Sequence, residues 1–223
     1  MPDKKRKQFM AIKLRKYNRV CPITGYKEDA IKVGAPVVVQ TDRGIEFGEI
    51  MSYQGKKAKA KSRDVKLKKV VRYATPEDIE KESKIPELED KGSEIAAQKA
   101  MEHELPIKVA GVEYLFDTGR VIIYYKVAEG KKVKNLRDLS RDLSSSLKAR
   151  VDMRQISPRD EARIIGGLGP CGRSLCCSSW LEKPRYVTVK MVKEQGLAIS
   201  PTKTSGVCGR LMCCLEYEYN KKK

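Results

Sequence analysis

The stretch PIKVAGVEYLFDTGRVIIYYKV, residues 106–127, decides the fold of the middle of this chain. Its two halves, residues 106–116 and 120–127, are rich in β-branched and aromatic side chains, which favour strands. Between them stands Asp117-Thr118-Gly119, a sequence typical of a tight turn. The pattern predicts two antiparallel strands joined as a β-hairpin. Apolar runs such as Val121–Tyr125 are too short to cross a bilayer, so we expect no membrane insertion.

Helices are predicted on both sides of this hairpin. Before it, Thr75-Pro76-Glu77-Asp78 supplies a capping hydroxyl, a proline at the first helical position and acidic residues in the first turn. The helix that begins there is expected to break near Pro86 and Gly92 and to resume as far as about Glu104.

After the hairpin, residues 135–148 carry four leucines at helical spacing, with Asn135 as the expected cap. Residues 150–156 alternate apolar and polar side chains, which predicts a strand. The resulting order α-β-β-α-β favours a two-layer domain with helices packed on one face of a sheet.

The N-terminal part predicts a second group of strands. Residues 8–14, 36–41 and 45–53 have the composition of strands, and the last two flank a turn at Asp42-Arg43-Gly44. Gly48, inside the last of these strands, suggests a bulge or a bend. We expect these strands to form a small β-barrel or sheet.

The fold class expected from these patterns is α+β, in three parts. Residues 1–64 are expected to form the β-rich region with a basic loop, residues 65–156 the two-layer domain, and residues 157–223 a cysteine-rich region of helices and loops. In the third part, Ser157-Pro158 begins a further helix. The residues from Tyr217 onward are expected to form a solvated tail.

The chain has a net charge of +18, and its charges are segregated. Residues 55–72 hold nine Lys or Arg and one Asp, whereas residues 77–104 hold ten acidic residues and four lysines. The basic segment predicts contact with a nucleic-acid backbone, and the alternative is a solvated face. The candidate nucleic-acid-binding residues are Lys56, Lys57, Lys59, Lys61, Arg63, Lys66, Lys68 and Lys69.

Six of the seven cysteines lie in two copies of the pattern C-G-R-x-x-C-C. The first cysteine repeat is CGRSLCC at residues 171–177, and the second cysteine repeat is CGRLMCC at residues 208–214. The N-terminal sequence MPDKKRKQFM has no apolar signal segment, so we expect a cytoplasmic location. In a reducing compartment such thiol clusters are more often metal-binding or catalytic than disulfide-bonded.

The two repeats predict an all-sulfur metal site. About four soft donors are needed, and the only histidine, His103, is distant in sequence. Thiolates suit an iron–sulfur cluster or a zinc ion, and the alternative is that the cysteines are only small buried side chains. The candidate ligands are Cys171, Cys176, Cys177, Cys208, Cys213 and Cys214.

One four-thiolate set is expected to combine both repeats: Cys171 with Cys176 or Cys177, and Cys208 with Cys213 or Cys214. The two remaining thiols would then serve a second centre shared with a partner. Four further residues are expected to support the cluster, the glycines by letting the backbone turn around the sulfurs and the arginines by offsetting negative charge: Gly172, Arg173, Gly209 and Arg210. Cys21 is isolated and is expected to be structural.

The sequence lacks a P-loop, a G-x-G-x-x-G motif and a C-x-x-C redox pair. With a single histidine, it also offers no obvious nucleophilic triad. We therefore expect that the protein is not an enzyme.

Two stretches, RVDMRQISPRDEARIIGGLGPCGRSLCCSSWL (150–181) and SPTKTSGVCGRLMCCLEYE (200–218), strongly resemble bacterial YaaT/RicT-type proteins. These proteins carry the polymerase-suppressor (PSP-type) C-terminal conserved domain, which corresponds here to about residues 65–156. The family's six cysteines are all present in the two cysteine repeats.

The resemblance implies a regulatory subunit rather than a catalyst. Members of this family assemble with helical subunits of the YlbF and YmcA types, and the complex carries 4Fe-4S clusters. It acts with the endoribonuclease RNase Y in mRNA processing and turnover, and in spore-formers it affects sporulation, competence and biofilm formation. Direct RNA binding and a structural zinc site remain the alternative for this chain.

Overall fold

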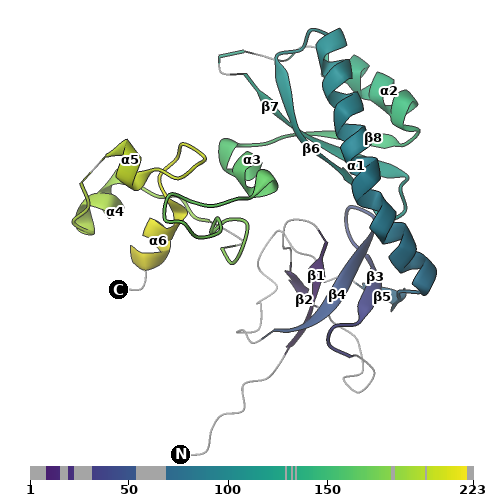
Figure 1. The fold of residues 1–223 in the computed structure, drawn as a ribbon, viewed down its shortest axis with the longest axis horizontal. Helices are drawn as coiled ribbons and strands as arrows, with labels where there is room; N and C mark the ends of the chain where they lie inside the picture. The colour runs from purple at the N-terminus through teal and green to yellow at the C-terminus, as the bar shows by residue number, and fades with distance from the viewer. Residues whose placement is uncertain are drawn as a thin grey trace, which may run out of the picture. The chain divides into compact units, whose positions relative to one another are not determined.

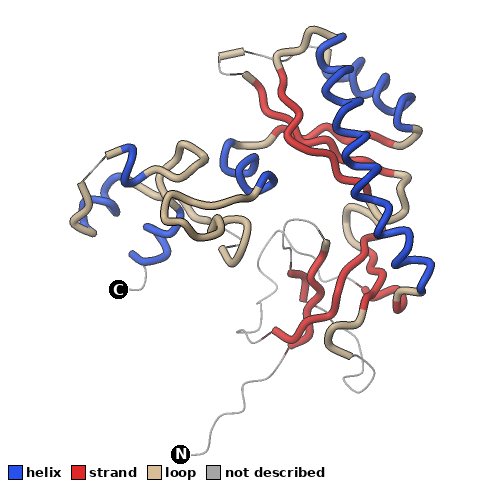
Figure 2. Tube along the Cα trace, in the orientation of Figure 1, coloured by secondary structure: helices blue, strands red, loops and turns tan. Residues whose placement is uncertain are grey.

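The structure is a computed structural model that describes residues 9–15, 20–22, 32–53, 69–128, 130–131, 133, 135–181, 184–198 and 200–219. It contains two compact units (Figures 1 and 2). The first combines Met1–Leu105, Val112–Ile123 and Lys134–Met153, and the second combines Pro106–Gly111, Tyr124–Val133 and Arg154–Lys223. The α+β class is confirmed, while the three-part division expected from the sequence stays a prediction.

Five N-terminal strands form the first sheet: β1 (Phe9–Leu14), β2 (Val20–Pro22), β3 (Pro36–Gln40), β4 (Ile45–Tyr53) and β5 (Lys69–Tyr73). Their order is β2-β1-β4-β3-β5, and every pairing is antiparallel. The expected sheet is therefore confirmed. Its closure into a barrel is not, because within the described part of the chain the outer strands β2 and β5 pair only with β1 and β3.

Gly48 allows β4 to lie close against β1. A Cβ at this position would lie 2.5 Å from Cγ2 of Ile12 and 3.0 Å from the carbonyl oxygen of Lys13. Of the bulge or bend expected there, the bulge was wrong, since the pairing of β4 continues through Gly48 on both sides. The register shift falls instead between Val38 and Val39, where β3 meets β5.

Helix α1 (Pro76–Glu102) is continuous, so the expected break at Pro86 and Gly92 was wrong. The predicted cap is present, because Thr75 closes a capping box with Asp78. Ile85 and Gly92 are both buried, so packing holds the helix together on either side of the proline. A Cβ at Gly92 would lie 3.2 Å from the Tyr114 ring, which indicates that this glycine allows close contact with the sheet.

The second sheet completes the predicted α-β-β-α-β order. Its strands β6 (Ile107–Tyr114), β7 (Arg120–Val127) and β8 (Arg150–Gln155) lie in the order β6-β7-β8, and helix α2 (Leu136–Leu147) connects β7 to β8. The amide of Arg150 donates to the Gly119 carbonyl and that of Ile156 to the Tyr125 carbonyl. These bonds show that β7 and β8 run in the same direction, which requires a crossover such as α2.

Helix α2 packs beside α1 and buries Leu139 and Leu143 completely. The cap expected from Asn135 was wrong, because this residue has a left-handed backbone (φ 62°) and makes no side-chain capping bond. A capping residue normally has extended backbone, which brings its side chain over the first helical amides.

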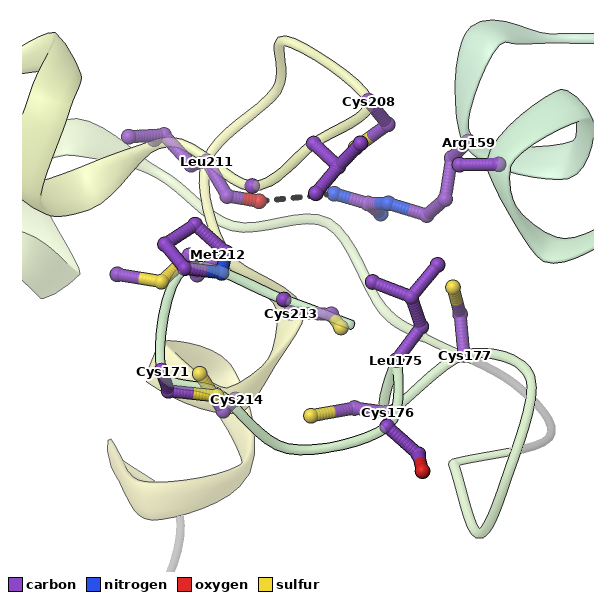
Figure 3. Close-up of a pocket in the computed structure, with 16 residues that line it drawn as sticks. Arg159, Cys171, Leu175, Cys176, Cys177, Cys208, Leu211, Met212, Cys213 and Cys214 are labelled. Atoms are coloured by element: carbon purple, nitrogen blue, oxygen red, sulfur yellow. Dashed lines mark hydrogen bonds between the residues drawn. The ribbon is translucent and has the colours of Figure 1, made fainter. Parts of the chain in front are cut away.

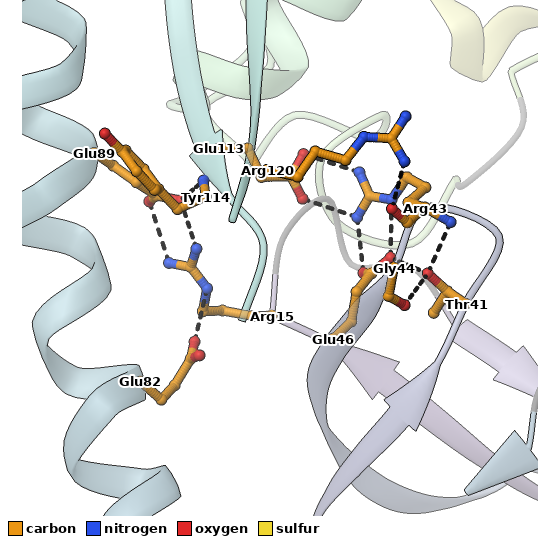
Figure 4. A network of polar contacts seen from close by, with 10 residues as sticks. All are labelled: Arg15, Thr41, Arg43, Gly44, Glu46, Glu82, Glu89, Glu113, Tyr114 and Arg120. Atoms are coloured by element: carbon orange, nitrogen blue, oxygen red, sulfur yellow. Dashed lines mark hydrogen bonds and ion pairs between the residues drawn. The ribbon is translucent and has the colours of Figure 1, made fainter. Parts of the chain in front are cut away.

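A buried network of charges joins the first sheet to Glu113, in the part of β6 that belongs to the first unit (Figure 4). Nη2 of Arg43 lies 2.7 Å from a carboxylate oxygen of Glu46 and 2.8 Å from one of Glu113. Burial disfavours the charge of Arg43, but the hydrogen bonds to both carboxylates outweigh it and raise the pKa of the guanidinium. A second pair, Arg15 with Glu89, connects β1 to α1 in the same way.

The C-terminal part contains four short helices, α3 (Pro158–Ile165), α4 (Val189–Glu194), α5 (Pro201–Thr204) and α6 (Cys213–Tyr219). Ser157 caps α3 with a capping box, as predicted. The tail expected from Tyr217 was wrong in part, since α6 continues to Tyr219 and the ring of Tyr217 contacts Trp180. Of the helices that the structure describes, none is long and apolar enough to span a membrane.

Candidate metal centre

All six cysteines of the two repeats line one cavity of about 60 Å³ in the second unit (Figure 3). The other lining residues are mostly glycines and aliphatic side chains. Cys171 is exposed, Cys177 is buried, and the remaining four are half-buried. The fold therefore brings both repeats to the same site, although they are separated in sequence.

The two cysteine repeats fold into the same turn. In the first, the amide of Gly169 donates to the Arg173 carbonyl at 2.8 Å and the amide of Gly172 to the Gly169 carbonyl at 2.9 Å. In the second, the matching bonds run from Gly206 to Arg210 and from Gly209 to Gly206, both at 2.9 Å. An isolated β-bridge closes each turn, Leu168 with Ser174 and Ser205 with Leu211.

Glycines allow these turns at two positions in each repeat. Gly172 and Gly209 have φ values of 74° and 71°, a left-handed conformation that other residues rarely adopt. Gly169 and Gly206 lie under the first thiol of their repeat, where a Cβ would be 3.5 Å from Sγ of Cys171 and 3.8 Å from Sγ of Cys208. The sequence predicted this role for Gly172 and Gly209.

The repeats meet through equivalent positions. Trp180 and Tyr217 each stand three residues after the last cysteine of their repeat, and their rings contact edge to face with centroids 4.5 Å apart. The two repeats therefore contact each other at equivalent positions.

The thiols that border the cavity come from both repeats. Cys171, Cys176 and Cys177 belong to the first, and Cys208, Cys213 and Cys214 to the second. A centre at this cavity could therefore take ligands from both repeats.

Burial and crowding keep several of these cysteines protonated. Burial first, and then the neighbouring Cys176 and Cys177, raise the pKa of Cys213 to about 11. Burial and Cys176 also raise the pKa of Cys214, and burial raises that of Cys177. When neighbouring thiols lose their protons, the resulting thiolates repel one another. A bound cation removes this repulsion, so such a group of thiols is suited to binding one.

Arg159 on α3 is the charged side chain that reaches the cavity, and sequence analysis missed it. Its Nη2 donates to the carbonyl oxygen of Leu211 at 3.0 Å (Figure 3). Arg173 and Arg210, which the sequence suggested, are exposed and do not line the cavity. The one sequence signal for Arg159 was its place directly after the Ser157-Pro158 helix start.

The donor set fits a soft metal or an iron–sulfur cluster, because six thiols line the cavity and no carboxylate or imidazole is among its described lining residues. As they stand, no three His, Cys, Asp or Glu side chains of the described residues are close enough to form a metal-binding group. Binding therefore requires the thiols to turn further toward one another. His103 is not among the residues that line the cavity, and its Nε2 lies 3.2 Å from Oδ2 of Asp142.

The candidate nucleic-acid-binding segment falls almost wholly outside the described residues. Seven of its eight candidate residues lie outside the part of the chain that the structure describes: Lys56, Lys57, Lys59, Lys61, Arg63, Lys66 and Lys68. Lys69 begins β5, where its backbone pairs with Gln40. The structure thus places only the end of this segment, at an outer strand of the first sheet.

Comparison with known proteins gives three matches. The PSP1 C-terminal conserved region matches residues 68–156, and the third domain of PSP1-like proteins matches residues 186–221. The chain is 44% identical over 184 residues to the stage 0 sporulation protein YaaT of Bacillus subtilis (strain 168). This alignment covers 82% of the chain and 65% of the relative, slightly less than two thirds of its length. No solved structure matches the chain.

Proposed function

The chain belongs to the YaaT-type proteins that carry the PSP1 C-terminal conserved region, and on this premise we propose that it is a regulatory iron–sulfur subunit that modulates RNase Y-dependent mRNA processing. The relative's name assigns that protein to stage 0 of sporulation, which favours regulation over metabolism as the role of this chain. The protein is proposed to act in the cytoplasm and without catalysis of its own.

The convergence of six thiols on one cavity is the observation that carries this proposal. A 4Fe-4S cluster needs four thiolates, and the cavity offers them from both repeats together. Cys171, Cys176, Cys177, Cys208, Cys213 and Cys214 are the residues proposed to hold it. When bound, the cluster would supply a redox- and iron-sensitive group whose presence fixes the two repeats to each other.

The proposed partners are helical subunits of the YlbF and YmcA types together with RNase Y. Exposed apolar side chains of the second unit offer a surface for protein contacts, since Tyr186 is 88% exposed and Trp180 is 51% exposed. In a spore-former, the proposed consequences extend to sporulation, competence and biofilm formation.

A complementation experiment tests this function. A strain that lacks the chain is supplied with the wild-type protein or with the Cys176→Ser/Cys213→Ser variant, and the 5′ ends of RNase Y-dependent transcripts are mapped. We expect the wild type, but not the variant, to restore processing. Normal processing with the variant at equal protein level would contradict a role for the metal centre.

A second candidate function is a nucleic-acid-binding protein with a structural zinc ion. It is supported by the net charge of +18 and the basic segment 55–72. This candidate predicts colourless, zinc-containing protein whose RNA affinity falls steeply with salt. Charge reversal at Lys56, Lys57 and Lys59 without any change in RNA affinity would remove its support.

A further inference from the structure

Arg159 is the only charged side chain among the described residues that line the cysteine cavity. Around it are thiols, glycines, Ser174 and apolar side chains such as Leu175 and Met212. Its guanidinium extends from α3 to the Leu211 carbonyl, inside the second cysteine repeat (Figure 3). One side chain from the helix before the first repeat is thus bonded to the backbone of the second.

The position of Arg159 in its helix goes against local preference. Ser157 is the N-cap and Pro158 the first helical residue, so Arg159 lies in the first turn of α3. The partial positive charge of this end favours acidic residues and disfavours arginine. An arginine at this end does not stabilise the helix, which indicates that its charge acts elsewhere. Arg159 lines the cysteine cavity, so the cavity is the place where its charge can act.

The helix that carries Arg159 is held firmly. Ser157 and Asp160 form a capping box at its start. Glu161, one turn along, lies 3.2 Å from Nζ of Lys126 on β7 and 3.7 Å from Nζ of Lys108 on β6. These contacts help to hold the backbone of Arg159 in place, which limits where its guanidinium can lie.

Arg159 shares its cavity with thiols of both repeats. The same cavity is lined by Cys177 of the first repeat and by Cys213 of the second. Arg173 and Arg210 are exposed, so solvent screens their charges from the site.

We propose that Arg159 is the counter-charge and positioning residue of the metal centre, holding the second repeat against α3 and offsetting the negative charge of the bound thiolates. A metal ion or cluster with four thiolates is an anion, and burying an anion among apolar side chains requires a nearby cation. The inference rests on the proposed function only in taking the six thiols as a metal site.

The test is a titration of the full-length, metal-free protein with Co(II) under anaerobic conditions, followed by thiolate-to-cobalt charge-transfer absorption. Arg159→Met and Arg159→Gln, which remove the charge, are expected to weaken Co(II) binding by about tenfold or more. Arg159→Lys keeps the charge and is expected to retain most of the affinity. Arg173→Gln and Arg210→Gln are matched exposed controls and are expected to bind like the wild type.

Circular dichroism of the metal-free variants verifies that each one folds, and the nearly isosteric Lys and Met variants separate charge from packing. Equal weakening by Lys and Met would show that the charge of Arg159 does not contribute to metal binding and would overturn the proposal, as would wild-type affinity in Met and Gln. A wild-type chain that binds no Co(II) would overturn this proposal and the proposed metal centre together. If the wild type binds Co(II) and the Arg159 variants bind it equally well, this proposal is wrong but the proposed function still stands.

Discussion

The six thiols of the cavity form three equivalent pairs, one member from each cysteine repeat. By their positions in the repeats, Cys171 corresponds to Cys208, and Cys176 to Cys213. The structure places all six around one cavity, three from each repeat. A centre built here therefore takes ligands from both repeats, as the sequence predicted for its four-thiolate set.

Equivalent cysteines are expected to be equally important for metal binding. Cys176→Ser and Cys213→Ser should each lower the bound metal of anaerobically loaded protein by a similar factor, because the two thiols line one cavity from equivalent positions of matching turns. Metal analysis by mass spectrometry measures this, with Cys21→Ser, outside the repeats, as the control. A large loss in one variant and none in the other would contradict the equivalence of the two repeats.

The left-handed glycines of the two turns are expected to be equally sensitive. A Cβ at Gly172 or Gly209 would meet nothing within 4 Å, so only backbone strain opposes it. Gly172→Ala and Gly209→Ala should each lower the stability of the second unit by about 1 kcal/mol, measured by urea unfolding of the metal-free chain. Gly119→Ala, in the first unit, is the control for alanine at a glycine without a positive φ. No difference from this control would show that the turns tolerate alanine.

At the level of elements, the capping box of α1 gives a pH-dependent contribution to stability. The Arg72 guanidinium, and then the amide and hydroxyl of Thr75, hold the pKa of Asp78 well below its ordinary value. A lowered pKa in the folded state stabilises the protein above the unfolded pKa, and this contribution is lost as the pH falls toward the folded value.

Asp78→Asn is therefore expected to lower the free energy of unfolding at pH 7, with the difference from the wild type shrinking on acidification below about pH 4. Thr75→Ala should cost about 1 kcal/mol through loss of the cap. Urea unfolding across pH measures both effects. A difference for Asp78→Asn that grows as the pH falls would contradict the assignment.

The charge network between β3–β4 and β6 is expected to be essential for the first unit. Arg43→Met leaves two buried carboxylates, Glu46 and Glu113, without their cation and should cost about 3–5 kcal/mol. Lys84→Met, which removes an exposed i,i+4 pair with Glu80, should change stability little, because solvent screens this pair. Thermal unfolding of both variants measures this contrast. A similar small loss in both would show that the network is not required.

Local patterns predicted many of these elements from the sequence. Strand-like composition located β4 and β7, and side-chain caps located the starts of α1 and α3. The errors arose where tertiary contacts override local preference. Packing carries α1 through Pro86, and the close approach of β1, not a bulge, explains Gly48.

The candidate site was predictable in its ligands but not in its surroundings. Two identical cysteine patterns suffice to identify the thiols, because the repetition itself is the signal. The choice of Arg173 and Arg210 followed from their closeness in sequence, whereas the residue that lines the cavity is Arg159, twelve positions before Cys171. Only the fold of α3 against the second repeat reveals this.

For the whole molecule, the two proposed activities belong to different units. The cysteine repeats and their cavity lie entirely within the second unit, whereas residues 55–72 belong to the first. Loss of the metal centre is therefore expected to leave the direct electrostatic affinity for RNA unchanged. Filter binding of RNA to the wild type and to Cys176→Ser/Cys213→Ser at several salt concentrations tests this separation. A weaker affinity of the variant at every salt concentration would contradict it.

The most direct test of the metal centre is the anaerobic absorption spectrum of the full-length chain, with iron, acid-labile sulfide and zinc measured on the same sample. We predict a broad brown absorption with iron and sulfide in equal amounts, which disappears in the Cys176→Ser/Cys213→Ser variant. Colourless protein after anaerobic reconstitution with iron and sulfide, whether it holds zinc or no metal, would contradict the iron–sulfur assignment.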